Sequence, residues 1–192
     1  MRQNEAAPSG DDRDERVASA TAGSTPSRSR LSMHVVNIAD HPDLVDVIGR
    51  WHWDQWGTNV PGRSLESWTS SLRGQMRRDS VPSTFVALDG DIPVGSVCLV
   101  EHDMPDSPDR GHLTPWVAYT FVVPTRRGQG VGRMLMAHAE AAAAAMGFTR
   151  VYLYATTARV FYEQLGWDPL ADDYYEGESV TIMALDLETP RR

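Results

Sequence analysis

The stretch from Arg126 to Leu135, RRGQGVGRML, constrains the fold more than any other part of the sequence. It places Gly128, Gly130 and Gly132 between an apolar run and a segment with helical spacing. We therefore expect a strand that passes through a loop with few side chains into a helix. Glycine lets a backbone come close to a ligand, and the first N–H groups of a helix have no intrahelical acceptor. The stretch predicts an anion site at a helix N-terminus.

Three interpretations of this loop compete. A dinucleotide fingerprint, G-x-G-x-x-G, fails because Arg133 occupies its third glycine position. A phosphate-binding P-loop needs Lys, and all 18 basic residues of the chain are Arg. The third interpretation is a tight turn whose glycines serve only backbone geometry. Arg126, Arg127 and Arg133 add positive charge near the helix start, which favours an anion there.

The flanking sequence alternates between strand-like and helical patterns, which indicates a mixed α/β domain. Asp89-Gly90 predicts the two-residue turn of a hairpin. The expected strands are residues 33–39, 84–88, 92–100, 113–123, 150–155 and 180–187, with a further strand after Trp167 left open. The expected helices run from Pro42 into the 51–57 stretch and over residues 64–78, 131–146 and 158–166.

Trp51, Trp53 and Trp56 cluster at the end of the first expected helix. Leu44 and Ile48 already supply the apolar stripe of that helix, so these aromatic rings exceed what one stripe needs. The interpretation that they cap the core is favoured. The alternative is that some of them line a substrate pocket, where rings supply contact area at low entropic cost.

Composition separates a tail from a domain. Residues 1–30 contain one β-branched aliphatic residue, Val17, and cannot bury enough apolar surface to fold. We expect a disordered tail at 1–30 and a single domain at 31–192. Whether residues 1–32 belong to the native protein or translation starts at Met33 stays open.

Charge and cysteine content exclude several functions. The formal net charge of -8 argues against nucleic acid, and the lack of a long apolar stretch argues against a membrane partner. We therefore expect a cytoplasmic protein. The lone cysteine, Cys98, lies in an apolar run and is expected to be a buried, inert thiol. The scattered His residues predict no metal site.

Two separated motifs resemble those of the GNAT superfamily of N-acetyltransferases. VVPTRRGQGVGRML, residues 122–135, resembles the pyrophosphate-binding segment of that family through Arg127, Gly130 and Gly132. FYEQLGW, residues 161–167, resembles its aromatic-Tyr-Glu-x-Leu-Gly-aromatic segment. The resemblance implies a mixed central sheet, mostly antiparallel with a splayed central strand pair, flanked by about four helices.

The resemblance also implies acetyl-CoA as co-substrate. Its pyrophosphate would lie on the glycine-rich stretch, its pantetheine arm would pair with the preceding strand, and a Thr would replace an Asn that many members carry before the Tyr helix. Thr156 or Thr157 could take that place, or could only cap the helix. The implied cofactor-binding residues are Thr120, Phe121, Val122, Arg127, Gly128, Gln129, Gly130, Val131, Gly132, Arg133 and Thr157.

The same resemblance assigns the proton donor. Tyr162 matches the family's usual acid, which protonates the leaving thiolate, and a backbone N–H of residues 120–122 would stabilise the oxyanion. The base is less defined. Glu101 leads narrowly, because a carboxylate at a strand end also attracts a cationic amine. The alternatives are His102, Asp103 and His112.

The implied activity is transfer of acetyl to a primary amine of a small molecule or peptide in a ternary complex. Polyamine, amino sugar, antibiotic, amino acid and protein N-terminus remain open as acceptors, and so does a homodimer. A rim of carboxylates favours a cationic amine: Asp103, Asp106, Asp109, Asp172, Asp173, Glu176 and Glu178. The alternative function is an acyl-CoA sensor without catalysis, which would keep the glycines but not need Tyr162.

Overall fold

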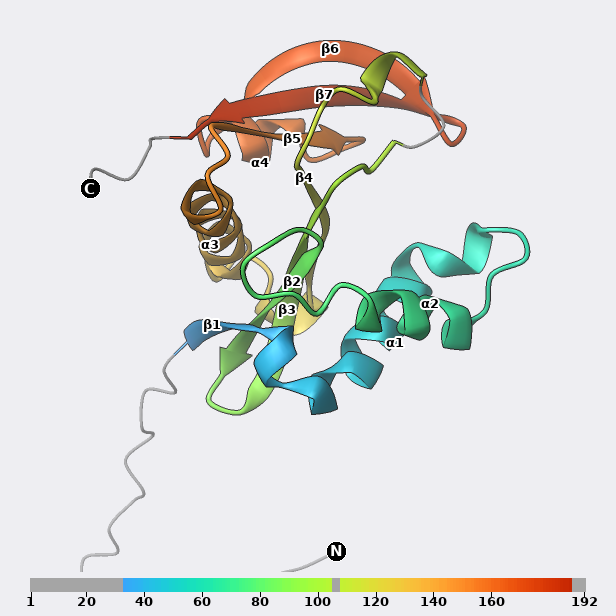
Figure 1. The fold of residues 1–192 in the computed structure, drawn as a ribbon, viewed down its shortest axis with the longest axis vertical. Helices are drawn as coiled ribbons and strands as arrows, with labels where there is room; N and C mark the ends of the chain where they lie inside the picture. The colour runs from blue at the N-terminus through green and yellow to red at the C-terminus, as the bar shows by residue number, and fades with distance from the viewer. Residues whose placement is uncertain (1–32, 105–107, 188–192) are drawn as a thin grey trace, which may run out of the picture. The chain divides into compact units, whose positions relative to one another are not determined.

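A computed structural model describes residues 33–104 and 108–187 (Figure 1). The predicted tail at 1–30 and Asp106 of the carboxylate rim lie outside the described residues. The described residues contain one sheet of seven strands in the order β1-β2-β3-β4-β5-β7-β6. The strands are β1 Met33–Asn37, β2 Ser83–Asp89, β3 Ile92–Val100, β4 Trp116–Val122, β5 Arg150–Ala155, β6 Asp168–Tyr175 and β7 Glu178–Asp186.

Helices cover both faces of this sheet. Figure 1 shows α3 on one side, and α1 and α2 on the other. The helices are α1 Val45–Gln55, α2 Leu65–Arg73, α3 Val131–Ala145 and α4 Arg159–Glu163, accompanied by short 3-10 turns. The predicted fold class is confirmed, and the strand left open after Trp167 is β6.

The sheet divides between β4 and β5. These neighbours are parallel, whereas the other strand pairs are antiparallel. Trp116 and Tyr152 form their one registered pair within the described strands, and the Tyr152 N–H donates to the Pro115 carbonyl at 3.0 Å. Beyond Trp116 the strands diverge, so the edge of β4 that faces β5 carries no ladder. The predicted splay is therefore present.

Apolar side chains form a core on each face. Val117 of β4 packs toward α3 with Leu135 and Met136, while its neighbour Ala118 packs on the opposite face with Cys98. This alternation follows from the period of two in a strand. On the α3 side, the Trp167 indole donates to Glu140 Oε1 at 3.0 Å and ties α3 to the segment after α4.

Two local predictions need correction. The helix predicted to reach Arg78 ends at Arg73, because Gly74 forms its C-cap. The hairpin turn is Gly90-Asp91 and not Asp89-Gly90, since Asp89 pairs with Ile92 and Gly90 has a φ of 63° at the first loop position. The Trp residues near 51–57 are half-buried, and Trp51 packs against the core cluster that contains Leu44 and Ile48, in agreement with the favoured interpretation.

Candidate functional site

The glycine loop, residues 126–133, leads from β4 into α3. Gly128 and Gly130 have φ values of 71° and 84°, a conformation that side chains rarely adopt. A Cβ atom at either position would meet no heavy atom within 4 Å, so both glycines face open space. Gly130 is the N-cap of α3, and the first helical bond runs from Met134 N–H to the Gly130 carbonyl at 3.0 Å. The preceding N–H groups are therefore available to a ligand.

Gly132 has a different task from its neighbours. A Cβ atom there would lie 3.3 Å from Cζ of Phe161. The missing side chain thus lets the first turn of α3 approach α4, which carries Phe161. Val131 beside it is buried in the core. Gly132 therefore serves packing, whereas Gly128 and Gly130 leave space for a ligand.

The arginines of the loop are not equivalent. Arg126 forms an ion pair with the buried Asp89. Its charge therefore stabilises the fold and is not available to a ligand, contrary to the expectation from the sequence. Arg127 Nε donates to the Val122 carbonyl at 3.0 Å, and the Gln129 amide donates to the Thr125 carbonyl at 2.9 Å. Arg133 is exposed on the first turn of α3.

A β-bulge distorts β4 beside the splay. Ser96 pairs with Phe121 and Cys98 pairs with Ala118, so Tyr119 and Thr120 stand opposite a single residue of β3. Tyr119 has a φ of 50°. A bulky residue in this region is strained, and such strain persists where the surrounding structure enforces it. The bulge turns Tyr119 and Thr120 toward different surroundings.

Thr120 and Tyr162 meet on the α3 side of the bulge. The Tyr162 phenol lies beside the Thr120 hydroxyl, which donates to the sulfur of Met136 at 3.7 Å. Burial raises the pKa of Tyr162, and the neighbouring Thr120 hydroxyl offsets part of that rise. The phenol therefore stays protonated over the neutral range. The structure brings together two predicted site residues that lie far apart in the sequence, one on β4 and one on α4.

Two other predicted cofactor residues lie differently. Phe121 turns its ring toward α1, with its centroid 5.4 Å from that of Trp51, so its backbone alone faces the splay region. Thr157 is exposed between β5 and α4. The alternative that Thr156 or Thr157 caps the helix is wrong, because the N-cap is Ala158 and it makes no side-chain capping bond.

On the opposite face, Tyr119 joins an aromatic group from α1 and α2. His52 stacks on Tyr119 with centroids 5.5 Å apart, and Trp56 and Trp68 approach the same ring at 5.4 and 6.1 Å. His52 is buried, and its Nε2 lies 2.9 Å from Ser96 Oγ. Burial lowers the pKa of His52 to about 3, so the ring is neutral at pH 7. Sequence reasoning missed His52, although it lies four residues after Ile48 on the same helical face.

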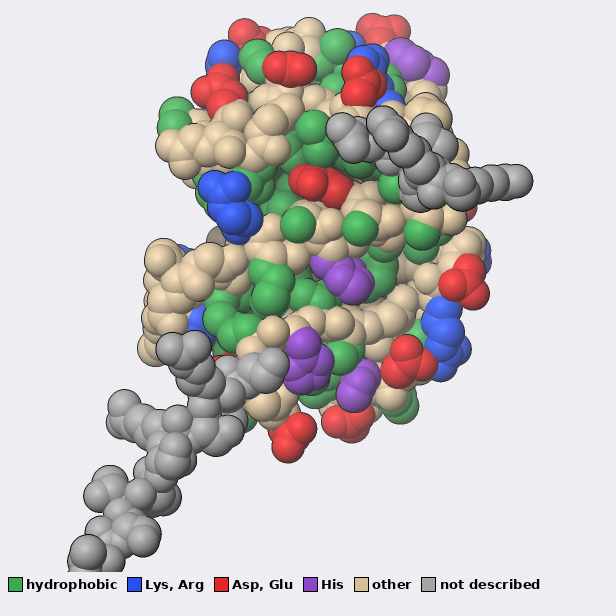
Figure 2. Space-filling view, turned by 90° about the vertical axis from the view of Figure 1, so that its left-hand side faces the viewer, with side chains coloured by type: hydrophobic (Ala, Val, Ile, Leu, Met, Phe, Trp, Pro, Cys, Tyr) green, Lys and Arg blue, Asp and Glu red, His purple; other side chains and the backbone are tan. Residues whose placement is uncertain are grey.

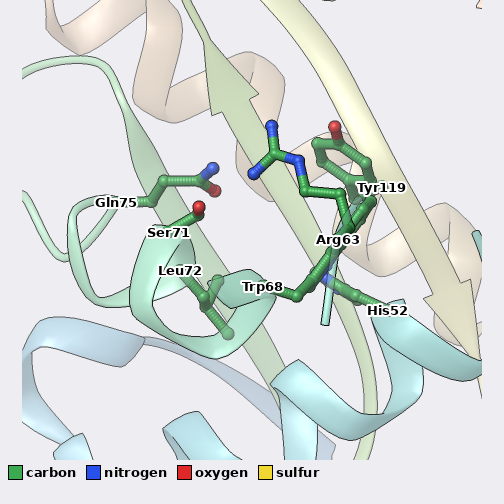
Figure 3. Close-up of a pocket in the computed structure, with 7 residues that line it drawn as sticks. All are labelled: His52, Arg63, Trp68, Ser71, Leu72, Gln75 and Tyr119. Atoms are coloured by element: carbon green, nitrogen blue, oxygen red, sulfur yellow. The ribbon is translucent and has the colours of Figure 1, made fainter. Parts of the chain in front are cut away.

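Two hollows adjoin this aromatic group and share Gln75 and Tyr119, and we use the name acceptor cleft for the two together. Figure 3 shows the first, where side chains from the end of α1, the segment before α2, α2 itself and β4 converge. Its lining residues are His52, Arg63, Trp68, Ser71, Leu72, Gln75 and Tyr119. The second hollow is lined by Gln75, Pro82, Val100, Glu101, His102 and Tyr119.

The carboxylates predicted as bases lie at different depths. Glu101 is exposed at the second hollow, whereas Asp103 is half-buried. Burial, assisted by the charge of Glu176, raises the pKa of Asp103 to about 7. Burial is the main cause that raises the pKa values of the Tyr119 and Tyr162 phenols, and the charge of the Asp103 carboxylate raises both further. Asp103 therefore acts electrostatically on both sides of the bulge.

Parts of the carboxylate rim serve the fold. Asp173 accepts from Arg110 Nε at 3.1 Å, and Asp172 accepts from the Thr181 hydroxyl at 2.9 Å. Arg110 thus neutralises Asp173, and the Thr181 hydroxyl occupies Asp172, although both carboxylates were expected to attract a cation. Figure 2 views the molecule from the side that carries α3, where acidic and basic side chains lie interspersed.

A family model described as the acetyltransferase (GNAT) family matches residues 45–167, well over half of the chain. The chain belongs to this family. The match includes the glycine loop, the bulged β4 and Tyr162. A search of curated protein sequences finds no significant match.

Solved structures of GNAT proteins share the fold. An aminoglycoside 6'-N-acetyltransferase complexed with coenzyme A has a TM-score of 0.63 at 16% identity, with 83% of this chain and 99% of that chain covered. The spermidine/spermine N-acetyltransferase SpeG from Vibrio cholerae gives 0.60 at 16%, covering 81% and 95%. Ard1 from Thermoplasma volcanium gives 0.60 at 14%, covering 81% and 98%. At these identities the likeness establishes the fold alone.

Acetyl-CoA is the co-substrate of GNAT acetyltransferases, and the glycine loop fits its diphosphate. Open space lies in front of Gly128 and Gly130, and the N–H groups at the start of α3 supply donors. Within the described residues, no cluster of His, Cys, Asp and Glu could hold a metal ion. No helix in this part of the chain combines the length and apolarity needed to cross a bilayer.

Proposed function

We propose that this GNAT protein transfers the acetyl group of acetyl-CoA to a primary amine of a small molecule or peptide, by direct attack in a ternary complex. The observation that carries the proposal is the position of the half-buried Tyr162 phenol beside Thr120, which lies next to the splay on the strand that leads into the glycine loop. A phenol that could act as an acid thus lies next to the strand edge that would receive the pantetheine arm.

The chain's own groups would bind the co-substrate in two places. N–H groups of residues 128–133, with Arg133, would hold the diphosphate. The edge of β4 at residues 120–122 would pair with the pantetheine arm, once Arg127 releases the Val122 carbonyl. Acetyl-CoA supplies the acetyl group as a reactive thioester.

The reaction requires two proton transfers at defined atoms. A bond forms between the amine nitrogen and the acetyl carbon, the bond from that carbon to sulfur breaks, and one proton leaves nitrogen while another reaches sulfur. The Tyr162 phenol, which stays protonated at neutral pH, would donate to sulfur. Asp103 would accept the amine proton, directly or through water. Its pKa of about 7 suits this task, and the exposed Glu101 is the alternative base.

Direct attack is favoured over an acetyl-enzyme. The lone cysteine, Cys98, is buried as predicted, and burial raises the pKa of its thiol to about 12. Such a thiol supplies almost no thiolate at pH 7. Cys98 therefore does not serve as a covalent acetyl carrier.

Replacement of Tyr162 by Phe tests the proposal. The variant keeps the ring and loses the proton donor, so kcat should fall roughly 10²- to 10⁴-fold while KM for acetyl-CoA changes little. CoA release from a panel of primary amines measures both. Tyr174→Phe is the matched control, because Tyr174 is an exposed residue of β6 whose hydroxyl donates to the Gly177 carbonyl.

The outcomes separate enzyme from sensor. Unchanged turnover in Tyr162→Phe would remove Tyr162 as the acid. Tight acetyl-CoA binding by the parent protein without turnover of any amine would favour the sensor. The aminoglycoside and spermidine/spermine acetyltransferases among the similar structures support an amine as the acceptor.

A further inference from the structure

Most arginines of the described residues have a partner that fixes them. Arg73, Arg78 and Arg110, for example, form ion pairs with Asp46, Asp40 and Asp173. Within the same residues, the side chains of Arg63 and Arg133 form no ion pair or hydrogen bond, although the Arg63 backbone N–H donates to the Val60 carbonyl at 3.3 Å. Arg133 stands at the glycine loop, where an anion is expected. Arg63 raises the question of what its guanidinium binds.

Arg63 lines the first hollow of the acceptor cleft, just before the N-cap of α2 at Ser64. Figure 3 shows its guanidinium directed into the same space as the Tyr119 phenol and the Gln75 amide. The neutral ring of His52 adds no charge, since burial keeps its pKa at about 3. Among the described residues that line this hollow, Arg63 alone carries a formal charge at pH 7.

The other end of the acceptor cleft has the opposite sign. Glu101 lines the second hollow, which meets the first at Gln75 and Tyr119. The carboxylates of Asp103 and Glu176 act on the Tyr119 phenol, whose pKa is raised by burial first and by these charges next. A cation is therefore favoured on one side of Tyr119 and an anion on the other.

We propose that the acceptor is an amine that also carries a carboxylate, with the carboxylate bound by Arg63 and the amine directed toward the acidic end of the acceptor cleft. The proposal rests on the proposed acetyltransferase function and names its substrate class. The aromatic wall of Trp68 and Tyr119 would pack against the carbon chain between the two groups.

A guanidinium matches this class better than the alternatives. Its planar fork binds a carboxylate through two parallel hydrogen bonds, and Ser71 and Gln75 offer further donors in the same hollow. A polyamine would place a second cation beside Arg63, where like charges repel. The acceptor cleft thus selects against acceptors that bear only positive charge.

The test compares matched acceptors of increasing length. Unbranched ω-amino acids, the alkylamines of the same length and the corresponding diamines are assayed for CoA release. Calorimetry measures the binding of the same compounds to the protein in the presence of CoA, which reports recognition without turnover. Arg63→Gln removes the charge at the acceptor cleft. Arg50→Gln is the control, because Arg50 is exposed on α1 and pairs with Asp54 at 3.8 Å.

The expected result is that an amino acid binds at least tenfold more tightly than its alkylamine or diamine, and that Arg63→Gln removes this preference. A lost charge-assisted hydrogen bond corresponds to roughly a 10- to 100-fold change. KM for acetyl-CoA should stay at the parent value, and Arg50→Gln should behave as the parent. Equal binding of all three classes, or the same preference in Arg63→Gln, would overturn the inference. Carboxylate-dependent binding without turnover would support it while contradicting the proposed function.

Discussion

The glycine loop and the acceptor cleft are built by different means. The loop presents backbone groups, and its specificity comes from where side chains are missing, as at Gly128 and Gly130. The acceptor cleft presents side chains of α1, α2, β3 and β4, with Tyr119 at its junction. A shared strand joins the two regions, because β4 carries the bulge and then leads into the loop.

This difference explains how one fold can keep its co-substrate and change its acceptor. A backbone site depends on helix geometry and tolerates most changes in the surrounding side chains. A side-chain site changes whenever one of its residues changes. In this protein the bulge at Tyr119 and Thr120 sends one residue toward each region. Substitutions on the two sides should therefore affect different kinetic constants.

The largest effect should come from Asp103→Asn on the acceptor side. The amide keeps the shape but cannot accept the amine proton, so kcat/KM should fall roughly 10²- to 10⁴-fold near pH 8. The parent profile should rise with pH through about 7, because the base acts when deprotonated and burial raises the pKa of Asp103 to about 7. In the variant this limb should disappear, leaving only the limb of the amine itself. Initial rates between pH 5.5 and pH 9, a range set roughly by this pKa, measure both.

Groups around Asp103 bear on the same profile and need a control. The groups that interact electrostatically with Asp103 are Cys98, Tyr119, Tyr154, Tyr162 and Glu176. Burial raises the pKa values of the thiol and phenols above the range where the limb is expected, so they stay neutral there. Glu101→Gln is the matched control at the mouth of the acceptor cleft. Loss of the limb in Glu101→Gln and not in Asp103→Asn would make Glu101 the base.

A smaller effect, confined to the co-substrate, is expected from Gly130→Asn. Asn tolerates the left-handed conformation at φ 84°, yet its side chain would extend into the space in front of the loop. Acetyl-CoA affinity should fall roughly 30- to 100-fold, equivalent to about 2 to 3 kcal/mol. The melting temperature should change little. Calorimetry and thermal unfolding measure the two quantities.

Two further variants sharpen this result. Gly130→Val adds backbone strain of about 1 to 3 kcal/mol, because a β-branched residue does not fit this conformation, and should lower the melting temperature as well. Gly111→Ala is the control, since a Cβ atom there meets nothing within 4 Å. Full acetyl-CoA affinity in Gly130→Asn would exclude the loop from the diphosphate site.

Sequence reasoning predicts the backbone arrangement of the glycine loop correctly, because its signals are local. Gly128, Gly130 and the helix that follows lie within a few residues, so their geometry does not depend on distant partners. It fails where a distant partner decides. Arg126 was expected to serve an anion, but Asp89 in another strand takes its charge. The length of α2 was overestimated because Gly74 was not recognised as its end.

The acceptor cleft was less predictable for the same reason. The conformation of Tyr119 follows from the register between β3 and β4, which no stretch of sequence specifies alone. The proposed preference for Asp103 over Glu101 as the base rests on the burial of Asp103, and that burial is set by the fold around the end of β3. His52 could have been predicted from the sequence, because its spacing from Ile48 places it on the buried face of α1.

The most direct test of the central claim, transfer between two separately built regions in one ternary complex, is the initial-rate pattern with both substrates varied. The account predicts double-reciprocal lines that intersect, and a protein mass unchanged after incubation with acetyl-CoA alone. The buried thiol of Cys98 offers no covalent carrier between the two regions. Parallel lines together with an added acetyl mass would show an acetyl-enzyme and contradict the account.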